Sequence, residues 1–232
     1  MLNRTRPLAH DFLDARRAVG AELRARLAEL PASPFDWDRF DPVAVFDARS
    51  PDLRLANLAK AVCSAPARIA DLRALWNESV ATASFAYRLA PHLGADPATS
   101  AIAGLLHRFG DLLTVRAIGA IEHSAGVRLD AASKADLCAE HGGPQLDHVL
   151  RAWGVPPRAG AMAAGWRQMR EFPGAAADAA VVHLARFMAI EAVSPRFCAP
   201  GVVEGAAEEL GVSAQVLAMI RSQADFQRFE EV

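Results

Sequence analysis

The amino-acid sequence predicts an all-α protein. Apolar residues recur at intervals of three and four through most of the chain, which is the spacing of one face of a helix. Alternation of apolar and polar residues over the length of a strand is nearly absent. The chain has 232 residues, of which 52% are hydrophobic, so it can bury a sizeable core. A bundle of helices with a small helical lobe at the N-terminus is therefore expected.

The first 65 residues are predicted to form this N-terminal unit. Its first part is an amphipathic helix of about six turns, which packs on the body of the protein or pairs with a second copy. The apolar stripe of this helix comprises Leu8, Phe12, Ala15, Val19, Leu23, Leu27 and Leu30. Residues 31–51 then form a long irregular stretch with four prolines and four aromatic residues, which predicts a loop that packs against the core.

Residues 66–232 are predicted to form the main helical domain. Ser50-Pro51 and Asp96-Pro97 each place an N-cap residue before a proline of the first helical turn. These signals predict helices over residues 51–64, 68–92 and 97–115, of which the third is expected to be central and buried. Further helices are expected before the stop at Gly154 and Pro156, around residues 181–188, and as a pair over residues 201–221 with Ser213 as an N-cap.

Composition excludes several classes of protein. The net charge of −2 and the lack of a basic stripe make nucleic acid an unlikely partner. Three widely spaced cysteines form no C-x-x-C pair, so a disulfide framework and a zinc knuckle are not expected, and a reducing cytoplasm fits. No apolar stretch is long enough to span a membrane, and no signal peptide is expected. Phosphate-binding loops, serine-nucleophile elbows and H-E-x-x-H motifs are absent.

Five short strings occur in a characteristic order between residues 75 and 188. They are Leu75-Trp76-Asn77-Glu78-Ser79, then Ala103-Gly104-Leu105-Leu106-His107-Arg108-Phe109-Gly110-Asp111-Leu112-Leu113, then Glu140-His141-Gly142-Gly143, then Trp153-Gly154-Val155-Pro156, and finally His183-Leu184-Ala185-Arg186. In this order they resemble the HDOD family, the HD-related output domains of bacterial signalling proteins. The resemblance covers roughly residues 66 to 190 and is poor before Leu75. It implies an HD-domain-like helical bundle.

The resemblance also implies where a metal site has been lost. Catalytic HD-type phosphohydrolases bind metal ions through a histidine on one helix, a His-Asp doublet on the next and an aspartate on a later helix. Here Glu78 stands where the first histidine is expected, the doublet is His107-Arg108, and Arg186 replaces the late aspartate. A guanidinium stays protonated and offers no lone pair, so a divalent cation would be repelled. We therefore expect no metal, no cofactor and no catalytic residue.

Six residues mark the predicted vestigial pocket: Glu78, His107, Arg108, His141, His183 and Arg186. Glu78 is expected to pair with Arg108 or Arg186 in place of a metal. Alternatively, Arg108, His183 and Arg186 line an anion pocket. His107 is otherwise interpreted as a buried histidine that makes one hydrogen bond, and His141 as the cap of a turn before a helix break at Gly142-Gly143.

These observations favour a non-enzymatic regulatory module of bacterial signal transduction. It would act through a signalling protein partner, or through a small anionic or nucleotide ligand, and the long first helix offers a surface for a homodimer. The second hypothesis is a divergent metal-dependent phosphohydrolase, a nucleotide or cyclic-dinucleotide phosphodiesterase with Glu78, His107, Asp111 and His141 as ligands. The third is a helical nucleic-acid binder around residues 201–221, where glutamates have the wrong sign for phosphates.

Overall fold

The computed structural model describes residues 8–27, 32–46, 52–63, 67–166 and 177–223. Within these ranges every regular element is a helix and there is no strand, which confirms the all-α prediction. The α-helices are α1 (Leu8–Leu27), α2 (Pro42–Phe46), α3 (Leu53–Cys63), α4 (Ile69–Leu89), α5 (Pro97–Leu106), α6 (Phe109–Ala125), α7 (Ala131–Ala152), α8 (Pro157–Gly165), α9 (Ala177–Val193), α10 (Val202–Glu209) and α11 (Ala214–Gln223). Short 3-10 turns are η1 (Trp37–Arg39), η2 (Ala90–Leu93) and η3 (Pro195–Phe197).

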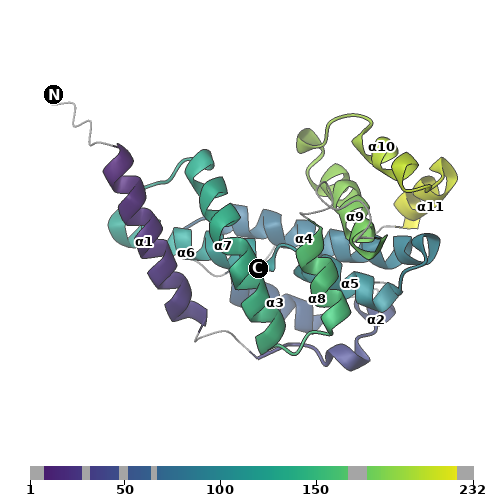
Figure 1. Ribbon diagram of the computed structural model, residues 1–232, viewed down its shortest axis with the longest axis horizontal. Coiled ribbons are helices and arrows are strands. Elements are labelled where there is room, and N and C mark those ends of the chain that lie inside the picture. Colours follow the sequence, from purple (N-terminus) through teal and green to yellow (C-terminus); the bar gives the residue numbers. More distant parts are fainter. Residues whose placement is uncertain (1–7, 28–31, 47–51, 64–66, 167–176, 224–232) are drawn as a thin grey trace.

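Helix α4 is the centre of the arrangement. It packs against α5, α6 and α9, while α6 and α7 pair with each other. In Figure 1, α1, α6 and α7 lie at one end of the molecule and α9, α10 and α11 lie at the other, with α4 and α5 between them. Helix α4 therefore joins the two ends, and a side chain in its middle can reach elements from both.

The core is continuous and follows α4 and α5. Every residue of α5 from Ser100 to Leu106 is buried. Helix α5 lies between α4, α8 and α9, which explains why its sequence is apolar on all sides rather than striped. Trp76 and Phe85 of α4, Phe109 of α6 and Met188 of α9 are among the largest fully buried side chains and belong to the same core cluster.

The N-terminal segments pack onto this core as predicted, but they contain more helix than was predicted. Helix α1 lies against α6 and α7, with Val19 and Leu23 buried, so the described part of its apolar stripe packs on the body. Residues 32–46 contain η1 and α2, so the stretch predicted to be irregular holds two short helical segments. The rings of Phe35, Trp37 and Phe40 contact one another, and Trp37 stacks on Trp153, which directly follows α7. This confirms a packing loop; the Ser50-Pro51 cap lies outside the described residues.

The single helix predicted over residues 97–115 is wrong, because the chain bends between α5 and α6. Asp96 caps α5 as predicted, accepting a hydrogen bond from Thr99 N at 2.7 Å. Arg108 then leaves the helical conformation, with φ −110° and ψ 10°. Apolar periodicity continues through the bend, since α5 packs on α4, α8 and α9 whereas α6 packs on α7 and α1. Two helices that share α4 as a partner but otherwise pack on different helices thus share one periodic pattern.

The predicted helix break at Gly142-Gly143 is also wrong. Helix α7 runs without interruption from Ala131 to Ala152 and includes both glycines and Pro144. A Cβ atom on Gly110 of α6 would lie 1.8 Å from Gly142 O, so the backbones of α6 and α7 touch at this point. Gly110 allows this close approach because it has no side chain, and the glycines of α7 do not end the helix. Helix α8, which was not predicted, follows directly after Pro156.

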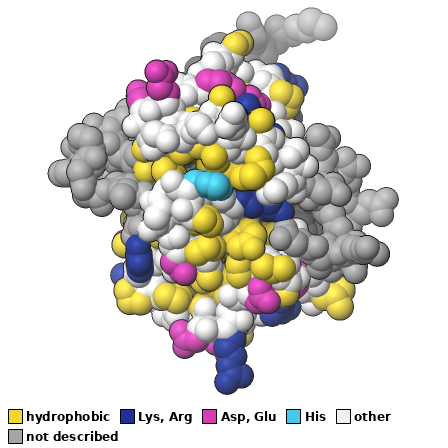
Figure 2. All heavy atoms as spheres, turned by 90° about the vertical axis from the view of Figure 1, so that its right-hand side faces the viewer, with side chains coloured by type: hydrophobic (Ala, Val, Ile, Leu, Met, Phe, Trp, Pro, Cys, Tyr) yellow, Lys and Arg dark blue, Asp and Glu magenta, His cyan; other side chains and the backbone are white. Residues whose placement is uncertain are grey.

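The C-terminal helices agree with the predicted pair. Helix α10 ends before Gly211, which has a left-handed backbone with φ 72°. The Ser213 hydroxyl accepts a hydrogen bond from Val216 N at 3.3 Å, which confirms the expected N-cap of α11. Figure 2 shows apolar side chains at the surface of this end of the molecule, interspersed with charged ones. None of the described helices combines the length and apolar character needed to cross a membrane.

The contact between α6 and α7 generates a prediction. Gly110→Ala should destabilise the fold by about 3 kcal/mol or more, because the added methyl group meets a rigid carbonyl rather than a flexible side chain. Gly143→Ala is the matched control, since a Cβ there has no atom within 4 Å and the residue is helical. Urea unfolding of both variants measures the difference. Equal stability of the two variants would contradict the close approach.

Candidate functional site

Glu78 lies where three parts of the fold meet. It is in the middle of α4, Arg108 lies at the junction of α5 and α6, and Arg186 lies on α9. The close packing of α4 against α5 brings these parts together: a Cβ on Gly104 would lie 2.8 Å from Ala83 Cα. Residues that are 30 and 108 positions from Glu78 in the sequence are thereby placed around one carboxylate.

The Glu78 carboxylate binds both guanidinium groups. Arg108 Nη1 donates to Oε1 at 3.1 Å and to Oε2 at 3.3 Å. Arg186 Nε donates to the same Oε1 at 2.8 Å. The side chains of Glu78, Arg108 and Arg186 are 14%, 19% and 20% exposed, so the group is largely shielded from water. The predicted pairing of Glu78 is confirmed, with both arginines rather than one.

Asp111 balances the charge of this group. Its side chain is 1% exposed, and its Oδ2 accepts a hydrogen bond from Arg108 Nε at 2.8 Å. Burial lowers the pKa of Arg108, but the combined attraction of Glu78 and Asp111 outweighs it and leaves this pKa raised. The pKa of Arg186 is lowered, mainly by burial and also by repulsion from Arg108, with Glu78 opposing. Two carboxylates thus face two guanidiniums, and we call Glu78, Arg108, Asp111 and Arg186 the ionic cluster.

His107 lies beside the ionic cluster and is fully buried. Its Nδ1 donates a hydrogen bond to Gly104 O at 2.7 Å, as expected for a buried histidine. The other ring nitrogen, Nε2, is 4.0 Å from Glu78 Oε1, which is beyond hydrogen-bonding distance. The backbone carbonyl of His107 accepts a hydrogen bond from Trp166 Nε1 at 3.1 Å. The bend between α5 and α6 is therefore held from both sides.

Trp166 is a member of the site that the sequence did not predict. Its ring lies under the Arg186 guanidinium, with 4.7 Å from Cζ to the ring centroid, and meets the His107 ring edge to face. A cation–π contact of this kind adds to the ion pair with Glu78. Only the position of Trp166 directly after α8 brings it here, and α8 itself was not predicted from the sequence.

The other two residues of the predicted pocket, His141 and His183, contact other side chains. His141 lies within α7, where its Nε2 is 3.9 Å from Glu140 Oε1 and its ring faces Gly20 of α1. It does not cap a turn, because α7 continues past it. The His183 ring packs edge to face on Phe187, its neighbour on α9. Of the six predicted residues, four surround the Glu78 carboxylate or adjoin it.

The residues around Glu78 do not fit a divalent metal ion. Its carboxylate already accepts hydrogen bonds from two guanidiniums, and Asp111 is engaged by Arg108. His107 uses Nδ1 as a donor to a backbone carbonyl. Within the described ranges, no group of three or more His, Cys, Asp and Glu side chains is arranged to hold a metal. The phosphohydrolase hypothesis requires His141 as a metal ligand. The His141 side chain instead lies next to Glu140 of α7 and Gly20 of α1.

Comparison with known proteins identifies the family. Residues 52–162 match the HDOD domain, from the start of α3 to the last turns of α8. This match assigns the central part of the chain to the HDOD family. An HDOD domain is an HD-related module associated with signalling, and the helical fold agrees with it. No curated protein and no solved structure matches the chain.

The HDOD match includes only part of the ionic cluster. Glu78, Arg108 and Asp111 lie inside the matched residues, whereas Trp166 and Arg186 lie after them. The second guanidinium on Glu78 is thus supplied by a helix beyond the matched HDOD segment. In this chain α9 completes the charge balance of the site.

Removal of the shared carboxylate should destabilise this HDOD domain. Glu78→Ala leaves Arg186 without its carboxylate partner and Arg108 with only Asp111, which should cost about 3 kcal/mol, because a shielded ion pair loses one member. Glu209→Ala, a substitution at an exposed position of α10, is the control and should change stability little. Thermal unfolding followed by circular dichroism compares the two. Unchanged stability of the Glu78 variant would argue against a cooperative cluster.

Proposed function

We propose that this HDOD protein is a non-enzymatic regulatory module of signal transduction. The observation that carries the proposal is the Glu78 carboxylate bound by the guanidiniums of Arg108 and Arg186. The ion pairs occupy the position where the family resemblance implies a metal. In this proposal the module works through binding, and the ionic cluster maintains the scaffold that binds.

Electrostatics supports this assignment. A divalent ion at about 4 Å from one guanidinium would be repelled by roughly 8 kcal/mol at an effective dielectric constant near 20. Two guanidiniums bind Glu78, so a cation competing for its carboxylate meets this repulsion twice. His107 contributes no negative charge to offset it. The arrangement favours a cross-link between α4, α9 and the bend between α5 and α6 over an activated water molecule.

The same geometry favours a protein partner over a small anion at this position. Arg108 is engaged by two carboxylates and Arg186 by one, with Trp166 against its face. An anion would have to displace Glu78 and bring further negative charge next to Asp111. We therefore propose a signalling protein, or a second copy of this chain, as the partner of the module.

The proposed location of the module is the cytoplasm. Cys63, Cys138 and Cys198 form no disulfide in the described part of the chain, and a reducing compartment keeps cysteines in this state. Burial raises the pKa of the Cys63 thiol to about 11, so it stays protonated and unreactive at neutral pH.

Metal content and hydrolysis test the proposal directly. The purified chain, incubated with Mn²⁺, Fe²⁺ or Mg²⁺ and desalted, should retain far less than one ion per chain by mass spectrometry. It should also leave bis(p-nitrophenyl) phosphate unhydrolysed. Stoichiometric metal together with phosphodiesterase activity would overturn the proposal in favour of the divergent phosphohydrolase.

A pair of substitutions provides the positive control. Arg186→Asp, alone and with Arg108→Asp, replaces the guanidiniums by carboxylates, which are ligands that divalent metals accept. If the guanidiniums are what excludes a metal, these variants should retain more Mn²⁺ than the wild-type chain under the same conditions. Circular dichroism identifies which of the two variants is folded, and the comparison uses that variant.

A further inference from the structure

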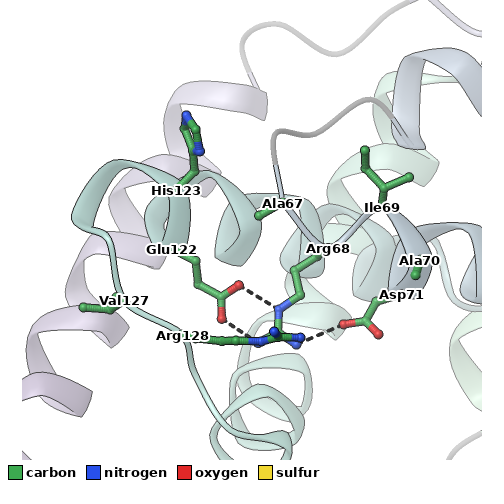
Figure 3. Close-up of a pocket in the computed structure, with 9 residues that line it drawn as sticks. All are labelled: Ala67, Arg68, Ile69, Ala70, Asp71, Glu122, His123, Val127 and Arg128. Carbon is green, nitrogen blue, oxygen red and sulfur yellow. Dashed lines mark hydrogen bonds and ion pairs between the residues drawn. The ribbon is translucent and has the colours of Figure 1, made fainter.

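A cavity at the start of α4 differs from the ionic cluster in its charge balance. It has a volume of about 470 Å³ and lies between the start of α4 and the end of α6 with the loop that follows. Figure 3 shows the residues that line it, with Arg68 between Glu122 and Asp71. The site residues predicted from the sequence do not include any of them.

The two carboxylates of the cavity are compensated by other cations. Glu122 accepts hydrogen bonds from Arg68 Nε at 2.7 Å and from Leu129 N at 2.7 Å. Asp71 Oδ2 accepts from Lys134 Nζ at 2.9 Å and from Arg68 Nη1 at 3.2 Å. Burial opposes these contacts, yet they leave the pKa of both carboxyl groups lowered, so both are ionised at neutral pH.

Arg68 serves this network rather than a ligand. Its backbone is in the left-handed region, with φ 64°, and it is the only residue other than glycine with a positive φ in the described chain. Its guanidinium also donates to Leu129 O at 2.6 Å. The side chain is 10% exposed and is saturated with acceptors from three segments. These bonds offset the cost of the backbone conformation, which is of the order of 1–2 kcal/mol.

Two further basic side chains line the cavity without such partners. Arg128 and His123 are exposed, and neither forms a hydrogen bond or ion pair with any residue that the structure describes. In Figure 3 the Arg128 side chain extends toward the ion pairs of Arg68, while His123 points away from Glu122. Arg68 and Arg128 thus balance Asp71 and Glu122 in the lining. Lys134, which binds Asp71 from outside the lining, adds one further positive charge next to the cavity.

The rim of the cavity is apolar. Ile69 is 41% exposed and Val127 is 40% exposed, and both line the cavity together with Ala67 and Ala70. Large apolar side chains at this exposure are uncommon on the described surface. A ligand that contacts them would need an apolar part next to its charged group.

We propose that this cavity binds a small organic anion, with a carboxylate or phosphate group at Arg128 and a short apolar body against Ile69 and Val127. The contrast with the ionic cluster supports this assignment. The guanidiniums around Glu78 are engaged by Glu78 and Asp111, whereas Arg128 attracts Glu122 electrostatically but forms no hydrogen bond or ion pair with a described carboxylate. The anion site is therefore separate from the vestigial metal position and independent of the function proposed for it.

Titration of the full chain with phenyl phosphate, benzoate, inorganic phosphate and phenol tests the site. In ¹H–¹⁵N NMR spectra, phenyl phosphate or benzoate should shift amide signals of residues 67–71 and 122–128 at millimolar concentration. Inorganic phosphate should bind more weakly, and neutral phenol should produce no saturable shift. The stronger of the two aromatic anions identifies whether the charged group is a phosphate or a carboxylate.

Matched variants separate charge from apolar contact. Arg128→Gln should weaken binding by about threefold to fivefold, the range that an exposed ion pair contributes. Arg151→Gln, at an exposed arginine of α7 outside the cavity, should leave binding unchanged. Ile69→Ser should weaken the binding of phenyl phosphate by about threefold and leave the binding of inorganic phosphate unchanged.

Three outcomes would overturn the proposal. The first is that neither aromatic anion shifts the amide signals. The second is that the Arg128 and Arg151 variants lose binding affinity equally. The third is that the shifted amide signals are those around Arg108 and Arg186. None of these readouts depends on metal content or hydrolysis. A failure here would leave the proposal for the ionic cluster standing, and the reverse also holds.

Discussion

One oxygen atom, Glu78 Oε1, accepts hydrogen bonds from two guanidiniums that come from different parts of the chain. Arg108 belongs to the bend between α5 and α6, and Arg186 belongs to α9, so the carboxylate on α4 joins three segments. An unpaired charge at this depth would cost several kcal/mol, which makes the position of each segment depend on the other two. A metal ion bound by several helices would impose the same constraint. The ion pairs therefore act as a cross-link within the helical scaffold.

The bend between α5 and α6 follows from the same constraint. A continuous helix would carry Arg108 in the regular α conformation, whereas the observed φ of −110° belongs to a residue that leaves it. The bend frees backbone groups, and each must find a partner. His107 O accepts from Trp166 Nε1, while Gly104 O accepts from the His107 ring. His107 and Trp166 thus provide hydrogen-bond partners for the backbone at the bend. Neither of them forms a hydrogen bond with the Glu78 carboxylate.

The sequence predicted the existence of most helices and failed where two helices share a pattern. Apolar periodicity records burial and not direction, so it continued through the bend at Arg108. The Gly142-Gly143 pair was interpreted as a helix break, because a sequence cannot distinguish a glycine that ends a helix from one that touches another backbone. The pairing of Glu78 with arginines was predictable, because a charge that is shielded from water is unstable without an opposite charge beside it. Trp166 was not, because nothing in its local sequence indicates a contact with Arg186.

The ionic cluster and the cavity lie on the same pair of helices. Asp71 and Glu78 are about 10 Å apart along α4 at 1.5 Å per residue. The start of α6 lies at the cluster and its end lies at the cavity, so α4 and α6 run in opposite directions between the two sites. A ligand in the cavity can influence the cluster only if it binds two arrangements of these helices with different affinity. Arg68 bridges α4 and α6 at the cavity as Arg108 does at the cluster, so a shift of one helix against the other would strain both ion-pair networks together.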